Sequence, residues 1–475
     1  MKYFPTNNKK LPYPKVLITL CVCLAPWLNT IAQHGIPIPT PAQLQWQEAE
    51  LAALVCWDLH VFDGEFYVQP KVRITPVEDY NTFHPEKYDM DQWIRSLKSA
   101  GFKIAIFTVS HETGFFFHQS DATPYSMKAL DWQQGKGDIL RDFKAACEKH
   151  GILPAVYIGT RWNAYYGVYD FKVQGDNEFA DNRQQHYNQM IEKIVEEIFT
   201  NYGDWAMVWF DGGAHGPEQG GPDVLSVFEQ HQPNAIFYHN LQRADIRWGG
   251  SETGTVPYPS WGTFPYPAIG AGESARKEIS ANNFQLLKTG DPNGSYYMPA
   301  MSDAPLRGNE GHDWFWEPNR AHTIYPLEKL VDMYYRSVGH NTTLILGVTP
   351  NPDGRLPEPD VKRLKEFGNE IDRRFSHPLA SVSGTGNTVP LVLKEAQNID
   401  QIVLQEDISK GERVREFELE AEINGKWTSI YEGSAIGHKH IVTIDPVLTR
   451  KIRVVALSAV GEPQIKNLSV YKPLQ

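Results

Sequence analysis

The chain has 475 residues, of which 41% are hydrophobic and 12% are aromatic, and its formal net charge at pH 7 is −12. This length accommodates one large domain and one smaller domain. The acidic balance, with no basic stretch beyond the N-terminal region, argues against a nucleic-acid-binding surface.

The first 33 residues have the pattern of a secretory signal peptide. A basic segment precedes the apolar run 16–28, which is too short to span a bilayer comfortably. We therefore expect residues 1–33 to be cleaved and the mature protein to be secreted or periplasmic, without membrane association; an uncleaved anchor is the alternative. Cys56 and Cys147 would remain, and we expect both to be buried free thiols.

Short apolar runs alternate with amphipathic segments from about residue 50 onward. Eight runs have the composition of strands, at 54–62, 102–110, 152–160, 206–213, 235–240, 246–252, 296–303 and 342–349. Predicted helices lie at 91–100, 137–150, 182–201, 326–338 and 358–375. This alternation predicts an α/β fold, a (β/α)8 TIM-like barrel over residues 34–377. The barrel is expected to be irregular around its fifth and sixth helices, with a long loop at 256–294; a doubly wound sheet is the alternative.

The pattern changes after residue 378. A Gly/Ser/Thr-rich stretch at 381–388 is predicted to be a linker, and short β-rich runs follow at 402–405, 414–423, 427–431, 440–444 and 451–457. These runs predict a small β-sandwich over residues 378–475. We expect it to support the barrel, and a carbohydrate-binding module is the alternative.

The fourth predicted strand carries the strongest functional signal. Its apolar run ends in Trp209, Phe210 and Asp211, followed by two glycines. A buried parallel strand of this kind places the carboxylate at the edge of the sheet where α/β folds build their sites. The alternative is that Asp211 only caps a turn.

Other predicted strands also end in side chains suited to binding a sugar. The candidates are Trp57 and His60 on the first strand and Glu65 after it, His111 and Glu112 after the second, Trp162 after the third, Trp209 within the fourth, Arg247 on the sixth, and Trp314 after the seventh. Neither a glycine-rich phosphate loop nor a serine nucleophile elbow is present in the sequence. The spacing of His60, His111 and His239 is too unspecific to predict a metal site, so we expect no metal.

Glycoside hydrolysis requires two carboxyl groups that flank one bond, about 5–5.5 Å apart in a retaining enzyme. We predict that Asp211 is the nucleophile. We predict that Glu252, in the glycine-containing loop 249–254, is the general acid and base. Glu273 and Glu310 are the competing candidates for the acid.

These stretches resemble the α-L-fucosidases of glycoside hydrolase family 29, and the resemblance covers residues 45–475. The family's Trp-Phe-Asp-Gly nucleophile motif corresponds to residues 209–212. The stretch before the second carboxylate, as in the 1,3/1,4-acting branch, corresponds to 247–254, with Ser251 in place of an asparagine. Further similar stretches are Tyr-Tyr-Met-Pro-Ala at 296–300 and Pro-Asn-Pro-Asp-Gly at 350–354.

The resemblance implies a retaining, exo-acting α-L-fucosidase that cleaves terminal α-1,3/1,4-fucosyl linkages of oligosaccharides or glycoconjugates by double displacement. It implies that Glu65 and His111 hold sugar hydroxyls and that Trp314 packs on the face that carries the methyl group. The family's histidine at the first strand is replaced here by Trp57, and His60 is placed to reach the same space. This change leaves two alternatives open, a glycosidase for a related sugar such as α-L-galactose and a non-catalytic sugar-binding barrel.

Overall fold

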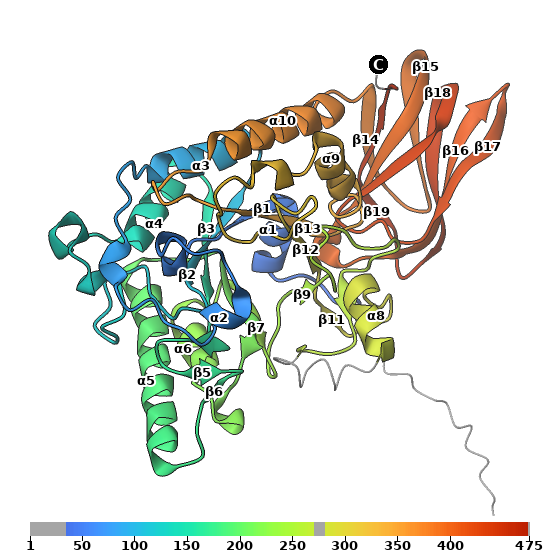
Figure 1. The fold of residues 1–475 in the computed structure, drawn as a ribbon. Helices are drawn as coiled ribbons and strands as arrows, with labels where there is room; N and C mark the ends of the chain where they lie inside the picture. Colours follow the sequence, from blue (N-terminus) through green and yellow to red (C-terminus); the bar gives the residue numbers. More distant parts are fainter. Residues whose placement is uncertain (1–34, 270–280, 474–475) are drawn as a thin grey trace, which may run out of the picture. The chain divides into compact units, whose positions relative to one another are not determined.

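The computed structural model describes residues 35–269 and 281–473 (Figure 1). The predicted signal peptide at 1–33 lies outside the described residues, as does part of the predicted loop at 256–294. Within the two described ranges, no helix combines the length and the apolar character that crossing a membrane requires.

Eight parallel strands form the central sheet, in the order β8-β7-β3-β2-β1-β13-β12-β9 (Figure 1). They are β1 (Leu51–Val55), β2 (Ile104–Ser110), β3 (Leu153–Ile158), β7 (Met207–Ala214), β8 (Ile236–Asn240), β9 (Arg247–Trp248), β12 (Ala300–Pro305) and β13 (Thr343–Val348). The first strand pairs with both the second and the last, as in a TIM barrel. Each strand overlaps a predicted one, which confirms the predicted fold class.

The barrel is irregular between β8 and β9. The strand β9 has only two residues and pairs with β12. On the other side, Asp245 joins β8 through its backbone N–H, which donates to the carbonyl of Phe237 at 3.0 Å. The Asp245 carboxylate in turn accepts from the N–H of Phe237 at 2.7 Å. Short polar contacts therefore replace the missing strand ladder.

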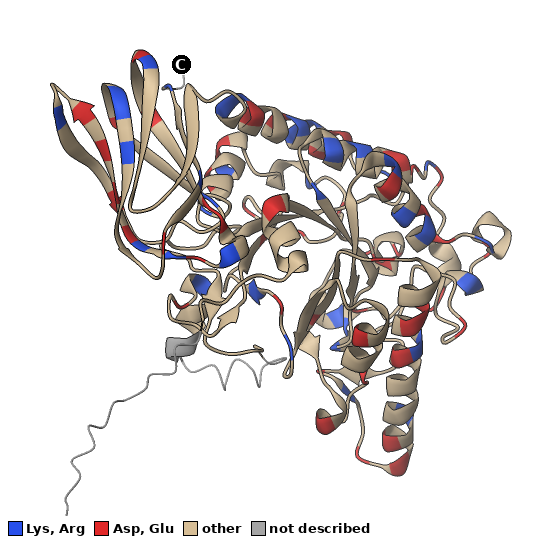
Figure 2. Ribbon diagram, turned by 180° about the vertical axis from the view of Figure 1, so that it is seen from behind, with Lys and Arg blue, Asp and Glu red and all other residues tan. Residues whose placement is uncertain are grey.

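Helices follow most of the strands. They are α3 (Met90–Ser99), α4 (Ile139–His150), α5 (Glu178–Asn201), α6 (Val224–His231), α8 (Ala281–Thr289), α9 (Leu327–Tyr335) and α10 (Glu358–Phe375). Asp89, Asp138 and Asn177 cap the first three of these helices, each accepting from a backbone N–H in the first turn. Acidic and basic residues are interspersed along α10 (Figure 2), where Arg373 and Arg374 both pair with Glu370.

Several predicted boundaries are wrong. The first strand ends at Val55, and residues 56–62 form a loop and the short helix η1 (Leu59–Phe62), which Asp58 caps. The seventh strand begins only at Ala300, because Tyr296 and Tyr297 belong to a separate two-stranded sheet. The helices α6 and α8 were not predicted; α6 has only eight residues, too few for a clear apolar period.

The C-terminal strands form an antiparallel sheet in the order β14-β19-β15-β18-β16-β17. They are β14 (Ala380–Thr385), β15 (Thr388–Glu406), β16 (Val414–Ile423), β17 (Lys426–Gly433), β18 (His440–Ala459) and β19 (Gln464–Tyr471). The predicted linker at 381–388 is wrong, since most of it lies in β14 and the start of β15. Register shifts within β15 interrupt its long pairing with β18, and the strands enclose their own apolar core, consistent with a β-sandwich.

Buried polar contacts join these strands to the barrel. The carboxylate of Glu412 accepts from the backbone N–H of Gly262 at 2.9 Å and from the side chain of Asn341 at 2.6 Å. Glu50, just before β1, forms ion pairs with His438 and Lys439. The C-terminal strands therefore contribute directly to the anchoring of barrel loops.

Candidate active site

The interior of the barrel contains an aromatic layer below the predicted nucleophile. Tyr157 on β3, Trp209 on β7 and Tyr238 on β8 are register partners in adjacent strands. The Trp209 ring lies 5.6 Å from the Tyr157 ring and 5.9 Å from the Tyr238 ring. Because side chains alternate along a strand, Trp209 and Asp211 point to the same side of β7. The layer therefore holds the end of β7 in place beneath Asp211.

Asp211 is open to solvent and is nevertheless surrounded by protein atoms. Tyr157 donates a hydrogen bond from its hydroxyl to Oδ2 of Asp211 at 3.1 Å. Burial raises the pKa of Asp211 above its ordinary value, and the negative charge of Glu252 adds to this, while His111 and the Tyr157 bond oppose it. The hydroxyl of Tyr157 thus orients the carboxylate of Asp211, as a nucleophile requires.

Glu252 lies in the loop that follows β9, and two side chains from the loop after β12 hold it. Trp314 donates from Nε1 to Oε2 of Glu252 at 2.9 Å, and Nε2 of His312 contacts the same oxygen. The Glu252 side chain is 42% exposed. Its charge raises the pKa of Asp211, so the structure brings the two predicted catalytic carboxyl groups within electrostatic reach of each other.

A third carboxyl group, Asp303 on β12, lies beside this pair. It is buried, and Trp248 donates from Nε1 to its Oδ1 at 2.8 Å. Burial raises the pKa of Asp303 well above its ordinary value, and the charges of Glu252 and Asp211 act in the same direction. A carboxyl group in such surroundings favours its protonated form.

Two predicted sugar-binding histidines are brought together by Asp58. This buried carboxylate lies 3.4 Å from Nδ1 of His60 and 3.9 Å from Nδ1 of His111. The Phe315 ring contacts both imidazoles, at 4.5 Å and 4.7 Å. Burial alone would raise the pKa of Asp58, but His60, His111 and a hydrogen bond from Thr113 overcome it and lower the pKa. The two histidines therefore share one fixed anionic support.

The structure does not bring Trp57 or Arg247 to this group, which corrects their predicted substrate-binding role. Trp57 is fully buried and packs against the rings of Trp93 and Phe117, at 5.0 Å and 5.7 Å. Arg247 is also fully buried, and it donates to the backbone carbonyl of Trp261 at 2.6 Å, among others. Burial lowers the pKa of Arg247 to about 10. Both side chains are enclosed by protein.

Glu112 and Trp162 are linked through arginines. Arg73 donates from Nε to Glu112 at 2.8 Å and lies over the Trp162 ring at 4.1 Å. Arg161 lies over the same ring at 4.6 Å. Arginine contacts therefore already occupy the buried Glu112 carboxylate and the Trp162 ring in this structure.

Two of the remaining predicted acids are exposed to solvent. Glu65 extends into solvent, where it pairs with Lys71 at 3.3 Å. Of the two competing acids, Glu310 is exposed on a turn, and Glu273 lies outside the described residues. Within the described ranges, no cluster of three or more His, Cys, Asp and Glu side chains is arranged to hold a metal ion. Cys56 and Cys147 are buried free thiols, as predicted.

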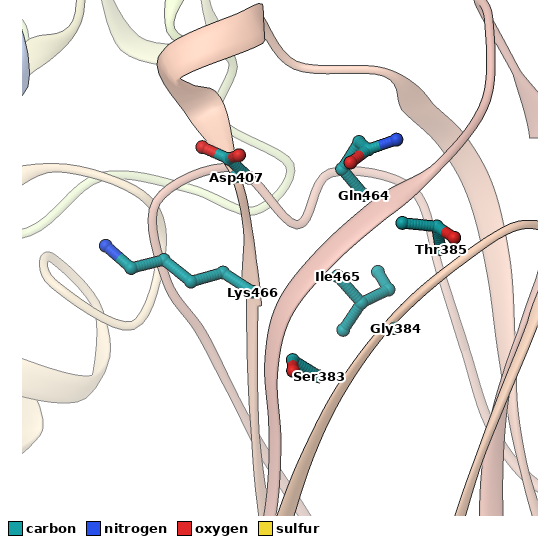
Figure 3. Close-up of a pocket in the computed structure, with 7 residues that line it drawn as sticks. All are labelled: Ser383, Gly384, Thr385, Asp407, Gln464, Ile465 and Lys466. Carbon is teal, nitrogen blue, oxygen red and sulfur yellow. The ribbon is translucent and has the colours of Figure 1, made fainter.

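A hollow of about 430 Å³ lies among the C-terminal strands (Figure 3). Its lining includes Asp407, Gln464 and Lys466, and it contains none of the predicted site residues. Asp407 caps a short helix, and Lys466 pairs with Glu48 at 2.8 Å. The charged side chains that line the hollow thus already have protein partners. The residues suited to glycoside hydrolysis lie on the barrel.

Sequence reasoning missed several residues of the site. They include Tyr157, His312 and Phe315. A usable signal existed for Tyr157, because it occupies on β3 the register that Trp209 occupies on β7. His312 precedes Trp314 by two residues in the loop after β12, but its contact with Glu252 depends on loop conformation.

Comparisons with known proteins agree with this architecture. The family model for alpha-L-fucosidase matches residues 77–373. Alpha-L-fucosidase 1 of Arabidopsis thaliana is 26% identical over 477 residues, covering 92% of this chain and 88% of the relative. A crystal structure from Bacteroides thetaiotaomicron, provisionally named an alpha-L-fucosidase, is 49% identical, with a TM-score of 0.89 over 92% of this chain and all of that one. A glycoside hydrolase 29 family member from a rumen bacterium is 29% identical, with a TM-score of 0.76 over 93% of this chain and 78% of that one. The chain therefore belongs to the alpha-L-fucosidase family, and it is a glycoside hydrolase.

Proposed function

We propose that this protein is a retaining, exo-acting α-L-fucosidase that releases L-fucose from terminal α-1,3/1,4 linkages of oligosaccharides or glycoconjugates. The observation that supports the proposal is that the charge of Glu252, in the loop after β9, raises the pKa of Asp211, which lies near the end of β7. The activity named for the family supports fucose as the sugar. Residues 1–33 direct secretion in this proposal, which rests on their sequence pattern alone.

The proposed mechanism is double displacement. The carboxylate of Asp211 attacks the anomeric carbon, while Glu252 protonates the glycosidic oxygen as the bond to the leaving group breaks. Glu252 then removes a proton from water, which attacks the same carbon and releases Asp211. This chemistry needs no cofactor, because the two carboxyl groups supply both the nucleophile and the proton.

In this proposal His60 and His111, which are held by Asp58, hydrogen-bond ring hydroxyls of the sugar. Trp314, which contacts Glu252, packs on the apolar face of the sugar. Glu65, Glu112 and Trp162 remain candidates for further sugar contacts, and Trp57 and Arg247 support the fold.

The test is to incubate the purified protein with a panel of fucosylated and α-L-galactosylated oligosaccharides and to identify the released sugar. We expect L-fucose from α-1,3/1,4-linked substrates and no release by Asp211→Asn. Release of L-galactose in preference to L-fucose would replace the sugar in the proposal. Binding of the oligosaccharides without any release would favour the non-catalytic barrel.

A further inference from the structure

Oε2 of Glu252, the proposed general acid, contacts a histidine that has no role in the proposed mechanism. Nε2 of His312 contacts Oε2 of Glu252, and Trp314 Nε1 lies 2.9 Å from that oxygen and 3.1 Å from His312 Nε2. The indole N–H can therefore donate to whichever of the two atoms does not hold a proton. This arrangement of three side chains accommodates the proton on either His312 or Glu252.

The surroundings favour keeping a proton on this pair. The hydrogen bond to Glu252 raises the pKa of His312; partial burial opposes this, and the charges of Glu252, Asp303 and Asp313 add to the rise. Asp211 and Asp303 also lie near Glu252, whose charge raises the pKa of both carboxyl groups. The positively charged Arg320 is paired with Asp313, with N–O distances of 2.7 and 3.1 Å.

We propose that His312 is a positioning residue that shares one proton with Glu252 and so keeps the general acid loaded at neutral pH. This inference rests on the proposed function, because it assigns a partner to the acid of that mechanism. His312 acts through Glu252 and makes no bond to the sugar in the reaction.

The proton balance follows directly. In the first step, the pair loses its shared proton through Glu252 to the glycosidic oxygen, the C1–O bond breaks with its electrons on that oxygen, and Asp211 bonds to C1. In the second step, water gives a proton to the pair and its hydroxyl to C1, and Asp211 leaves as a carboxylate. The pair ends with the proton that it had at the start.

The pH profile of the enzyme distinguishes a proton shared between His312 and Glu252 from a purely structural role of His312. Two coupled groups lose their last proton at a pKa that belongs to the pair. With His312 present, the alkaline limb of kcat/KM reports the raised value of the pair. Without the imidazole of His312, the limb no longer reports this pair, and the reference values of Glu and His differ by about two pH units.

The test is the pH profile of His312→Gln with a fucosylated oligosaccharide, in which the leaving group needs protonation. Glutamine can still donate an N–H to Glu252 but cannot titrate. We expect the alkaline limb to move to lower pH by about one unit, with kcat/KM near pH 7.5 falling about tenfold. With 4-nitrophenyl α-L-fucoside, whose leaving group needs little protonation, the fall is expected to stay below about threefold.

His322→Gln is the matched control, because His322 is exposed on the same loop. We expect the profile of this variant to coincide with that of the wild type. An unchanged alkaline limb in His312→Gln, with the wild type active, overturns the inference and leaves the proposed function intact. Failure of both the wild type and His322→Gln to release L-fucose overturns the proposed function itself.

Discussion

Tyr157 on β3 donates a hydrogen bond of 3.1 Å to the carboxylate of Asp211 on the adjacent strand β7. The tyrosine hydroxyl is buried below the barrel mouth, and it stabilises the ionised form of the carboxylate that the proposed attack on C1 requires. The bond therefore connects the aromatic layer of the barrel to the chemistry at its rim.

Replacing Tyr157 with phenylalanine removes this donor and retains the ring. Since the donor lowers the pKa of Asp211, its loss raises that pKa further, and the acidic limb of the kcat/KM profile should move to higher pH. We expect kcat/KM on the acidic side to fall about tenfold, the scale of one hydrogen bond to a charged group. Tyr187→Phe is the control, because its hydroxyl donates to the backbone carbonyl of Thr160. An acidic limb that stays in place would contradict the assignment.

Asp303→Asn tests whether the third carboxyl group is neutral in the folded protein. Its pKa is raised in the folded state, so ionisation costs stability as pH rises above the ordinary Asp value. Asparagine keeps an oxygen that can accept from Trp248 and carries no charge. We expect the variant to gain stability relative to the wild type between pH 5 and pH 8, as measured by urea unfolding. A relative loss over that range would show that Asp303 is ionised and stabilising.

Gly347 on β13 makes room for the tryptophan that holds Glu252. A Cβ atom at Gly347 would lie 2.5 Å from Cζ3 of Trp314. Gly347→Ala should therefore displace the indole, cost about 1–3 kcal/mol of stability by overpacking, and lower kcat on oligosaccharides at least about tenfold. The double variant Gly347→Ala/Trp314→Phe relieves the clash and should regain stability without regaining the lost activity. Full activity in Gly347→Ala would show that the position of Trp314 is unimportant.

The ion pair between Glu50 and Lys439 makes stability depend on pH. Burial alone would raise the pKa of Glu50, but Lys439 and His438 overcome it and lower the pKa below its ordinary value of 4.5. The stabilisation is therefore complete above that value and is lost as pH falls through the lower folded-state pKa. We expect Glu50→Gln to lose about 2 kcal/mol at pH 7 and progressively less below pH 4, as measured by urea unfolding.

Glu48→Gln is the control for this prediction. Glu48 pairs with Lys466 on the surface at 2.8 Å, where both side chains are about half exposed. Its loss should cost less than about 0.5 kcal/mol at either pH. Equal losses in the two variants would contradict the role given to Glu50.

The strands were predictable because buried parallel strands appear in sequence as continuous apolar runs, as at 207–210 and 344–346. The ends of the strands were harder to predict, and the errors affected the predicted site residues. The first strand ends at Val55, before the predicted position, and Trp57 packs in the core. Arg247 was expected at a binding surface, yet its guanidinium binds backbone carbonyls that only the folded loops bring near.

Asp211 and Glu252 could be proposed from sequence because each lies in a recognisable motif at or after a predicted strand. The support around the pair was not, since it comes from loop residues distant in sequence. His312 lies 60 residues from Glu252 along the chain, and Asp58 lies 55 residues from Thr113. Such contacts follow from the path of the loops, for which the local sequence pattern gives little information.

Double displacement by Asp211 and Glu252 is tested most directly by the configuration of the first-formed product, followed by NMR during hydrolysis of an α-L-fucoside before the free sugar equilibrates. We expect α-L-fucose to appear first, because two displacements at C1 restore the original configuration. Initial formation of β-L-fucose would contradict it, because a single displacement by water would then replace the attack by Asp211.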